Sequence, residues 1–106
     1  MALTAQAMLA ELNTHGWCQY RAFAGDGSVC LLGAAALAGA DPYGNWQVEP
    51  VWAVLADVIR EQFPERWLPD MFSPHPVTAV YRFNDHPDTT RADVDLILEK
   101  VIASEL

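Results

Sequence analysis

Cys30 is the residue whose type and position best suit nucleophilic chemistry. It stands at the start of an apolar run that predicts a helix, where the positive end of the helix dipole would favour a thiolate. A cysteine nucleophile also needs a base, and His75 and His86 are available for that role. Asn84 or Asp85 would then orient the imidazole. The alternative, which we favour, is that Cys30 is a small, buried and unreactive residue.

Metal binding is a second chemistry that the same residue types allow. The suitable ligand atoms belong to Cys18, Cys30, His75 and His86. No two of these residues have the close C-x2-C or H-x3-H spacing that is typical of a structural zinc site. We therefore expect neither a metal site nor a cofactor.

The polar run over residues 84–90 has two interpretations. Asp85 and Asp88 are suited to act as a general acid and a general base. An Asn-Asp-His-Pro sequence is also typical of a turn, because Asn and Asp side chains hydrogen-bond to nearby backbone groups. We favour the turn, and we keep Asn84 and Asp85 as candidate binding residues.

Three aromatic residues fall in stretches that are rich in turn-forming residues. Tyr43 and Trp46 lie in one such stretch, and Trp67 lies in another that is punctuated by prolines. Large rings in loops either cover a core or anchor an interface. We therefore add Tyr43, Trp46 and Trp67 to the candidate binding residues.

Length and composition indicate one soluble domain. The 106 residues suit a single globular domain over 1–106, and 52% of them are hydrophobic. The net charge of −8, with six scattered basic residues, argues against direct binding of nucleic acid. Two cysteines and the lack of a signal-like N-terminus predict a cytoplasmic protein with reduced thiols, and no run is long enough to span a membrane.

The hydrophobic pattern predicts a mainly α-helical fold. We expect about four helices around a central apolar helix over residues 28–40, with at most a small two- or three-stranded sheet. Thr4 and Gly16 would bound a first helix, Pro50 and Pro64 a second, and a Thr90-x-x-Asp93 capping box would start the last. Residues 77–83 fit either a strand or a helical turn, since so short a run has no decisive period.

Three short motifs stand out from this background. They are Gly16-Trp17, then Cys30-Leu31-Leu32-Gly33-Ala34, and finally Phe83-Asn84-Asp85 followed by Thr90 and Val94. Together they resemble a small domain family of unknown function that recurs in actinobacteria and their bacteriophages. The family pattern has Trp where this chain has Phe83, and its proline comes one place earlier than Pro87.

The resemblance implies a cytoplasmic protein of bacterial or phage origin and carries no activity with it. It directs attention to five positions, namely Trp17, Cys30, Gly33, Asn84 and Asp85. These residues would also specify the fold, Gly33 through close helix packing and Asn84-Asp85 through turn chemistry.

Three functions remain open on the sequence alone. The first is a small acidic protein that binds a protein partner, such as a phage-encoded modulator of a host protein. The second is a cysteine-dependent hydrolase or transferase that uses Cys30 with a histidine. The third is a homo-oligomeric scaffold, because the apolar content is generous for so short a chain. We favour the first, since no catalytic motif is evident.

Overall fold

The computed structural model describes residues 3–39, 50–67 and 75–105, and these ranges are mainly α-helical. They contain α1 (Ala5–His15), α2 (Leu31–Leu37), α3 (Pro50–Gln62), the short 3-10 helix η2 (Pro64–Arg66), α4 (Val77–Asp85) and α5 (Arg91–Glu105). The prediction of a mainly helical fold is therefore confirmed. Within the described ranges no residue belongs to a β-strand, so the small sheet is not found there.

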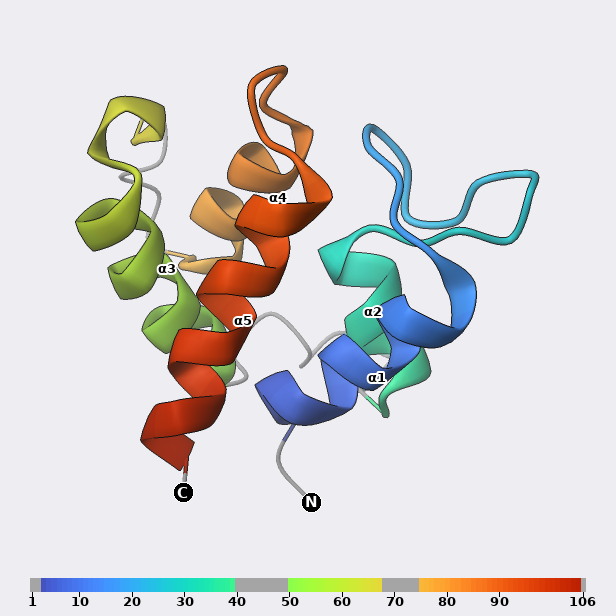
Figure 1. Ribbon diagram of the computed structural model, residues 1–106, viewed down its shortest axis with the longest axis horizontal. Helices are drawn as coiled ribbons and strands as arrows, with labels where there is room; N and C mark the ends of the chain where they lie inside the picture. The colour runs from blue at the N-terminus through green and yellow to red at the C-terminus, as the bar shows by residue number, and fades with distance from the viewer. Residues whose placement is uncertain (1–2, 40–49, 68–74, 106) are drawn as a thin grey trace.

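Helix α5 joins the two halves of the molecule. Helix α1 packs against α2, and α3 packs against α4, while α5 lies between the two pairs and contacts both α1 and α3 (Figure 1). Helix α4 reaches across to α2 and closes the arrangement. The side chains at the centre are fully buried and come from all five helices, namely Met8, Leu12, Leu31, Trp52, Leu55, Ile59, Val80, Phe83, Val94, Ile97 and Leu98.

The predicted central helix over residues 28–40 is wrong in its bounds and in its place. Helix α2 covers only Leu31–Leu37, because Cys30 is in extended conformation and Gly39 has a φ of 107°. Its last residue, Leu37, is 44% exposed. An apolar run is buried only where neighbours cover it, and here α1 and α4 cover one side of a short helix. Residue 40 lies outside the described residues.

The segment between α1 and α2 is irregular, and hydrogen bonds between its own backbone groups hold it together. Val29 forms two isolated bridges, a parallel one with Trp17 and an antiparallel one with Phe23. Because both bridges are isolated, this segment contains no strand. Residues 77–83, which fitted either a strand or a helical turn, belong to helix α4.

The local signals for helix ends are confirmed. The side chain of Thr4 accepts a hydrogen bond from the Ala7 N–H at 3.1 Å, which caps α1. Gly16 ends that helix with a φ of 87°, a conformation that suits glycine. Helix α3 begins at Pro50 and ends before Pro64. No helix in the described ranges has the length and apolar character to cross a bilayer.

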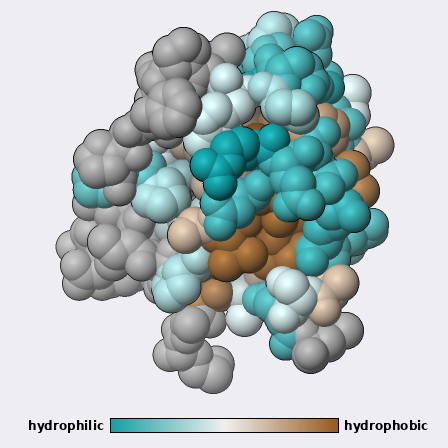
Figure 2. Space-filling model, turned by 90° about the vertical axis from the view of Figure 1, so that its left-hand side faces the viewer, coloured by the Kyte–Doolittle hydropathy of each residue, from teal (hydrophilic) through white to brown (hydrophobic). Residues whose placement is uncertain are grey.

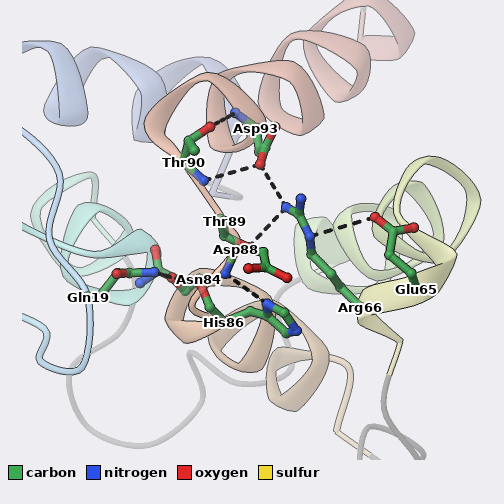
Figure 3. Close-up of polar contacts among 9 residues, drawn as sticks. All are labelled: Gln19, Glu65, Arg66, Asn84, His86, Asp88, Thr89, Thr90 and Asp93. Carbon is green, nitrogen blue, oxygen red and sulfur yellow. Dashed lines mark hydrogen bonds and ion pairs between the residues drawn. The ribbon is translucent and has the colours of Figure 1, made fainter.

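The capping box at the start of α5 is complete, and Arg66 extends it (Figure 3). Asp93 Oδ2 accepts a hydrogen bond from the Thr90 N–H at 3.1 Å, and the Asp93 N–H donates to Thr90 Oγ1 at 3.3 Å. Arg66 Nη1 donates to the same Asp93 oxygen at 2.7 Å and to Thr89 Oγ1 at 3.2 Å. The guanidinium also lies 4.6 Å from the centre of the Phe63 ring. Arg66 therefore links η2 to α5.

Replacing Gly33 tests the close packing of α2 against the irregular segment. A Cβ at this position would overlap the carbonyl oxygen of Ala22 and lie 3.1 Å from Val29 Cβ. We expect Gly33→Ala to lower the free energy of unfolding by about 2 kcal/mol, although alanine favours a helix by about 1 kcal/mol. Gly25→Ala is the matched control, because a Cβ there meets nothing within 4 Å. Equal stability of the two variants in urea titrations would contradict this packing.

Replacing Asp93 tests the capping box through its pH dependence. Burial raises the pKa of this carboxyl group, but hydrogen bonds from Arg66 and Thr90 outweigh it and hold the pKa below its ordinary value. The ionised group thus stabilises the fold at neutral pH, and this stabilisation is lost as the pH falls through the lowered pKa. We expect Asp93→Asn to lower the free energy of unfolding by about 1 kcal/mol at pH 7.

The free energies of unfolding of the wild type and Asp93→Asn should become more similar below about pH 4, where the carboxyl group of the unfolded chain is protonated. Urea titrations across this pH range measure them. Asp57→Asn is the control, because the Asp57 side chain is 72% exposed and its ion pair with Arg60 lies at the surface. A difference that is independent of pH would contradict the assigned role of Asp93.

Candidate functional site

Asn84, in the last turn of α4, is fully buried and holds two distant segments of the chain. Its Oδ1 accepts hydrogen bonds from Trp17 Nε1 at 2.7 Å and from the Leu31 N–H at 3.1 Å. Its Nδ2 donates to the Cys18 carbonyl oxygen at 3.2 Å and to Asp85 Oδ1 at 3.0 Å. A side-chain amide has two donors and two acceptor positions, so all four are used. We call these five residues the Asn84 clamp.

The residues that follow Trp17 are fastened to the same end of α4. Gln19 Nε2 donates to the carbonyl oxygens of Asn84 at 3.0 Å and His86 at 2.9 Å (Figure 3). The Tyr20 N–H donates to Asp85 Oδ1 at 2.8 Å. Carbonyl groups in the last turn of a helix have no partner within the helix, so Gln19 satisfies groups that would otherwise need water.

The three sequence motifs meet in this clamp. The Gly-Trp motif supplies Trp17, the cysteine motif supplies Leu31, and the Asn-Asp motif supplies Asn84 and Asp85. Close packing accounts for Gly33, as the sequence predicted. The turn predicted for Asn84 and Asp85 is wrong, because both residues are in helix α4 and their side chains bond to segments more than 50 residues away.

Cys30 does not have the environment of a nucleophile. Burial raises the pKa of its thiol, and this outweighs the lowering by the backbone N–H groups of Gly33 and Leu32 at the start of α2. The residue is 6% exposed. No hydrogen bond joins its sulfur to any of the three histidines, all of which lie in the described residues. Cys30 is therefore a buried thiol at the start of α2, without the lowered pKa that a thiolate would need.

The two candidate histidines flank helix α4. His75 is an exposed residue just before α4. His86 caps the end of α4, and its Nδ1 accepts a hydrogen bond from the Asp88 N–H at 3.1 Å. In the described part of the chain, no group of three histidine, cysteine, aspartate or glutamate residues is arranged to hold a metal ion.

Of the three predicted aromatic binding residues, Trp67 alone lies in the part of the chain that the structure describes. Trp67 is partly buried and packs against the core, with the Arg60 guanidinium 5.5 Å from its ring centre. Tyr43 and Trp46 lie outside the described residues. The aromatic side chains that the structure exposes are Tyr20 and Phe23, at 67% and 54%. The sequence analysis missed both.

Tyr20 is held in a conformation that few residues other than glycine adopt. Its φ is 71°, the only positive value outside glycine in the described residues. Such a conformation costs about 1–3 kcal/mol and persists where the surroundings impose it. Here the hydrogen bond from the Tyr20 N–H to Asp85 imposes it, while the phenol ring stays exposed.

A groove beside Tyr20 extends this surface. It has a volume of about 290 Å³ and is lined by Tyr20, Tyr81, Arg82, Asp85, His86 and Pro87. We call it the aromatic groove. Its walls come from the irregular segment and from the end of α4, which are the two parts that the Asn84 clamp joins. The groove is thus formed only when the clamp is intact.

A second, apolar groove lies on another face, where α1 and α3 begin and α5 ends. Its volume is about 320 Å³, and its lining residues are Leu3, Thr4, Pro50, Val51, Val54, Val101, Ser104 and Glu105. Figure 2, which views the molecule from the side of α3, shows hydrophobic side chains bordered by hydrophilic ones. The groove has no strained residue and no exposed aromatic ring, so it offers less for recognition than the aromatic groove.

Replacing Asn84 tests the clamp. In Asn84→Asp the two amide donors become a carboxylate oxygen that faces the Cys18 carbonyl and the Asp85 carboxylate. We expect the free energy of unfolding to fall by about 3 kcal/mol, because buried polar groups lose their partners and like charges meet. Asn13→Asp is the control, since Asn13 is exposed and should change stability by less than about 0.5 kcal/mol. Unchanged stability of Asn84→Asp in urea would contradict the clamp.

The chain belongs to a family that is described only as "Family of unknown function (DUF6197)", whose model matches residues 2–104. The match spans α1 to α5 and all residues of the Asn84 clamp. No curated protein and no solved structure matches the chain. Any functional conclusion must therefore come from the chemistry of the surface itself.

Proposed function

We propose that this protein acts by binding another protein through Tyr20, Phe23 and the aromatic groove, and that it is not an enzyme. The observation that carries the proposal is the fixed position of Tyr20. Its backbone is held at a φ of 71° by Asp85, while its side chain is 67% exposed. A strained residue whose side chain is mostly exposed gains little packing energy, so contact with a partner is the simplest reason for presenting it.

The physical chemistry of interfaces supports this surface. Tyrosine is among the residues that contribute most binding energy when they are buried at an interface. A backbone that is already held in place before binding loses little conformational freedom, which improves affinity. Phe23 is 54% exposed and belongs to the same irregular segment, and the aromatic groove adds a concave area beside Tyr20. Together they combine protruding rings with a cavity.

The charge balance suggests the chemistry of the partner. A net charge of −8 repels nucleic acid and attracts a protein with a basic surface. The motif resemblance to domains of actinobacteria and their phages leads us to place the protein in a bacterial cytoplasm. We propose that it modulates a host protein there.

The alternative functions have weaker support. A hydrolase or transferase based on Cys30 would need a more accessible thiol, a lower pKa and a nearby base, whereas Cys30 is 6% exposed and its pKa is raised. A homo-oligomeric scaffold would need a large apolar surface for self-association. Self-association through Tyr20 remains an outcome that the experiment below detects.

Photo-cross-linking tests the proposal directly. A photoreactive phenylalanine analogue placed at position 20 should cross-link one bacterial protein in a saturable manner. The same analogue at Leu96 is the control, because Leu96 is 37% exposed on α5 and does not line the aromatic groove. The captured protein is then purified and titrated. Changing Tyr20 and Phe23 together to alanine should weaken binding by at least about tenfold, and Leu96→Ala should not.

Three outcomes would contradict the proposal. The first is that position 20 cross-links no protein, or the same set as position 96. The second is that it cross-links only a second copy of this chain, which would indicate self-association instead. The third is an affinity that the double alanine variant leaves unchanged. Circular dichroism of each variant confirms that the fold is retained.

A further inference from the structure

The backbone pairing around Val29 brings the two cysteines together. The Val29 N–H donates to the Gly16 carbonyl oxygen at 2.9 Å, and the Cys18 N–H donates to the Val29 carbonyl oxygen at 3.0 Å. This is the pattern of a parallel bridge between Trp17 and Val29. Paired backbones lie about 4.8 Å apart, so the next residue on each segment is also a neighbour. Cys18 therefore lies beside Cys30.

The Asn84 clamp supports the same placement independently. One amide group binds both the Cys18 carbonyl oxygen and the Leu31 N–H, which is next to Cys30 in the chain. The Cys18 sulfur lies 3.3 Å from the Arg21 carbonyl oxygen and 3.6 Å from the Ser28 carbonyl oxygen, so it lies between its own loop and the segment that carries Cys30. A disulfide needs Cα atoms about 4.4–6.8 Å apart, and the general spacing of about 4.8 Å between paired backbones lies within this range.

The two thiols differ in access. Cys18 is partly exposed, whereas Cys30 is buried at the start of α2. A reagent from solution thus reaches Cys18 first, and only a group already inside the protein reaches Cys30. This asymmetry matches the roles of an attacking and a resolving cysteine in thiol–disulfide exchange.

We propose that Cys18 and Cys30 form a redox modification site, which low-molecular-weight disulfides such as oxidised glutathione convert to an internal disulfide. The Cys18 thiolate attacks one sulfur of oxidised glutathione, forms a mixed disulfide and releases one glutathione thiolate. Cys30 then attacks the Cys18 sulfur, and its proton passes to the second glutathione as this leaves. The protein loses two electrons and two protons, and the oxidant is reduced to two thiols.

The modification bears on the surface that carries Tyr20 and Phe23. The disulfide would close a loop over residues 18–30, which contains both exposed rings. In the reduced protein, hydrogen bonds of the Asn84 clamp already hold the two ends of this loop together. The disulfide would join the same two ends covalently. The proposal does not depend on the proposed partner binding, since it concerns only these two thiols.

Intact-mass measurement of the folded full-length chain tests the proposal. The reduced protein is incubated with mixtures of oxidised and reduced glutathione, quenched with acid and analysed. We expect the wild type to lose two hydrogen atoms and to show no free thiol after unfolding. Trypsin cleaves after Arg21, so the peptides that contain Cys18 and Cys30 should remain joined until a reductant is added.

Two serine variants separate the steps. In Cys30→Ser the reaction should stop once glutathione is bound to Cys18. This mixed disulfide should last at least about tenfold longer than in the wild type. Serine is a favourable residue at a helix N-cap, so α2 should be retained. Cys18→Ser should stay unmodified while folded and react at Cys30 only after denaturation.

Other outcomes would overturn the proposal. One is a wild type that accumulates the glutathione adduct for as long as Cys30→Ser does. Another is a disulfide that joins two chains, and a third is a folded wild type whose two thiols stay reduced while a peptide thiol in the same mixture is oxidised.

Discussion

The rest of the structure depends on the four hydrogen bonds of one buried amide. Asn84 has no exposed surface, and its side chain binds Trp17, Cys18, Leu31 and Asp85. In a medium of low polarity each of these bonds is strong, and each would be costly to leave unmade. The clamp therefore specifies one arrangement, in which the segment after α1 and the start of α2 both lie against the end of α4.

This constraint explains several features that would otherwise seem unrelated. The irregular segment approaches α2 so closely that only glycine fits at position 33. Asp85, fixed beside Asn84, holds Tyr20 in its strained conformation. The same pairing places Cys18 beside Cys30 and leaves the rings of Tyr20 and Phe23 in solvent. A stability element of the fold and a candidate recognition surface thus share one set of hydrogen bonds.

The sequence predicted what local chemistry decides. The ends of α1, α3 and α5 follow from Thr4, the prolines and the Thr90–Asp93 capping box, and all three helices are present. It could not predict how much of the apolar run over 28–40 is helical or covered, because that depends on α1 and α4. The sequence also identified Asn84 as a candidate residue but predicted that it lies in a turn. Local sequence could not show its actual partners, because they lie more than 50 residues away.

Hydrogen exchange of the groups bound to Asn84 tests the clamp most directly. Nuclear magnetic resonance can follow the Leu31 backbone N–H and the Trp17 indole N–H separately, both of which donate to Asn84 Oδ1. The account predicts that both exchange only on global unfolding, as slowly as the core amides of α5. If they exchange as fast as the amides of an unstructured peptide while the α5 amides stay protected, the clamp is not formed in solution.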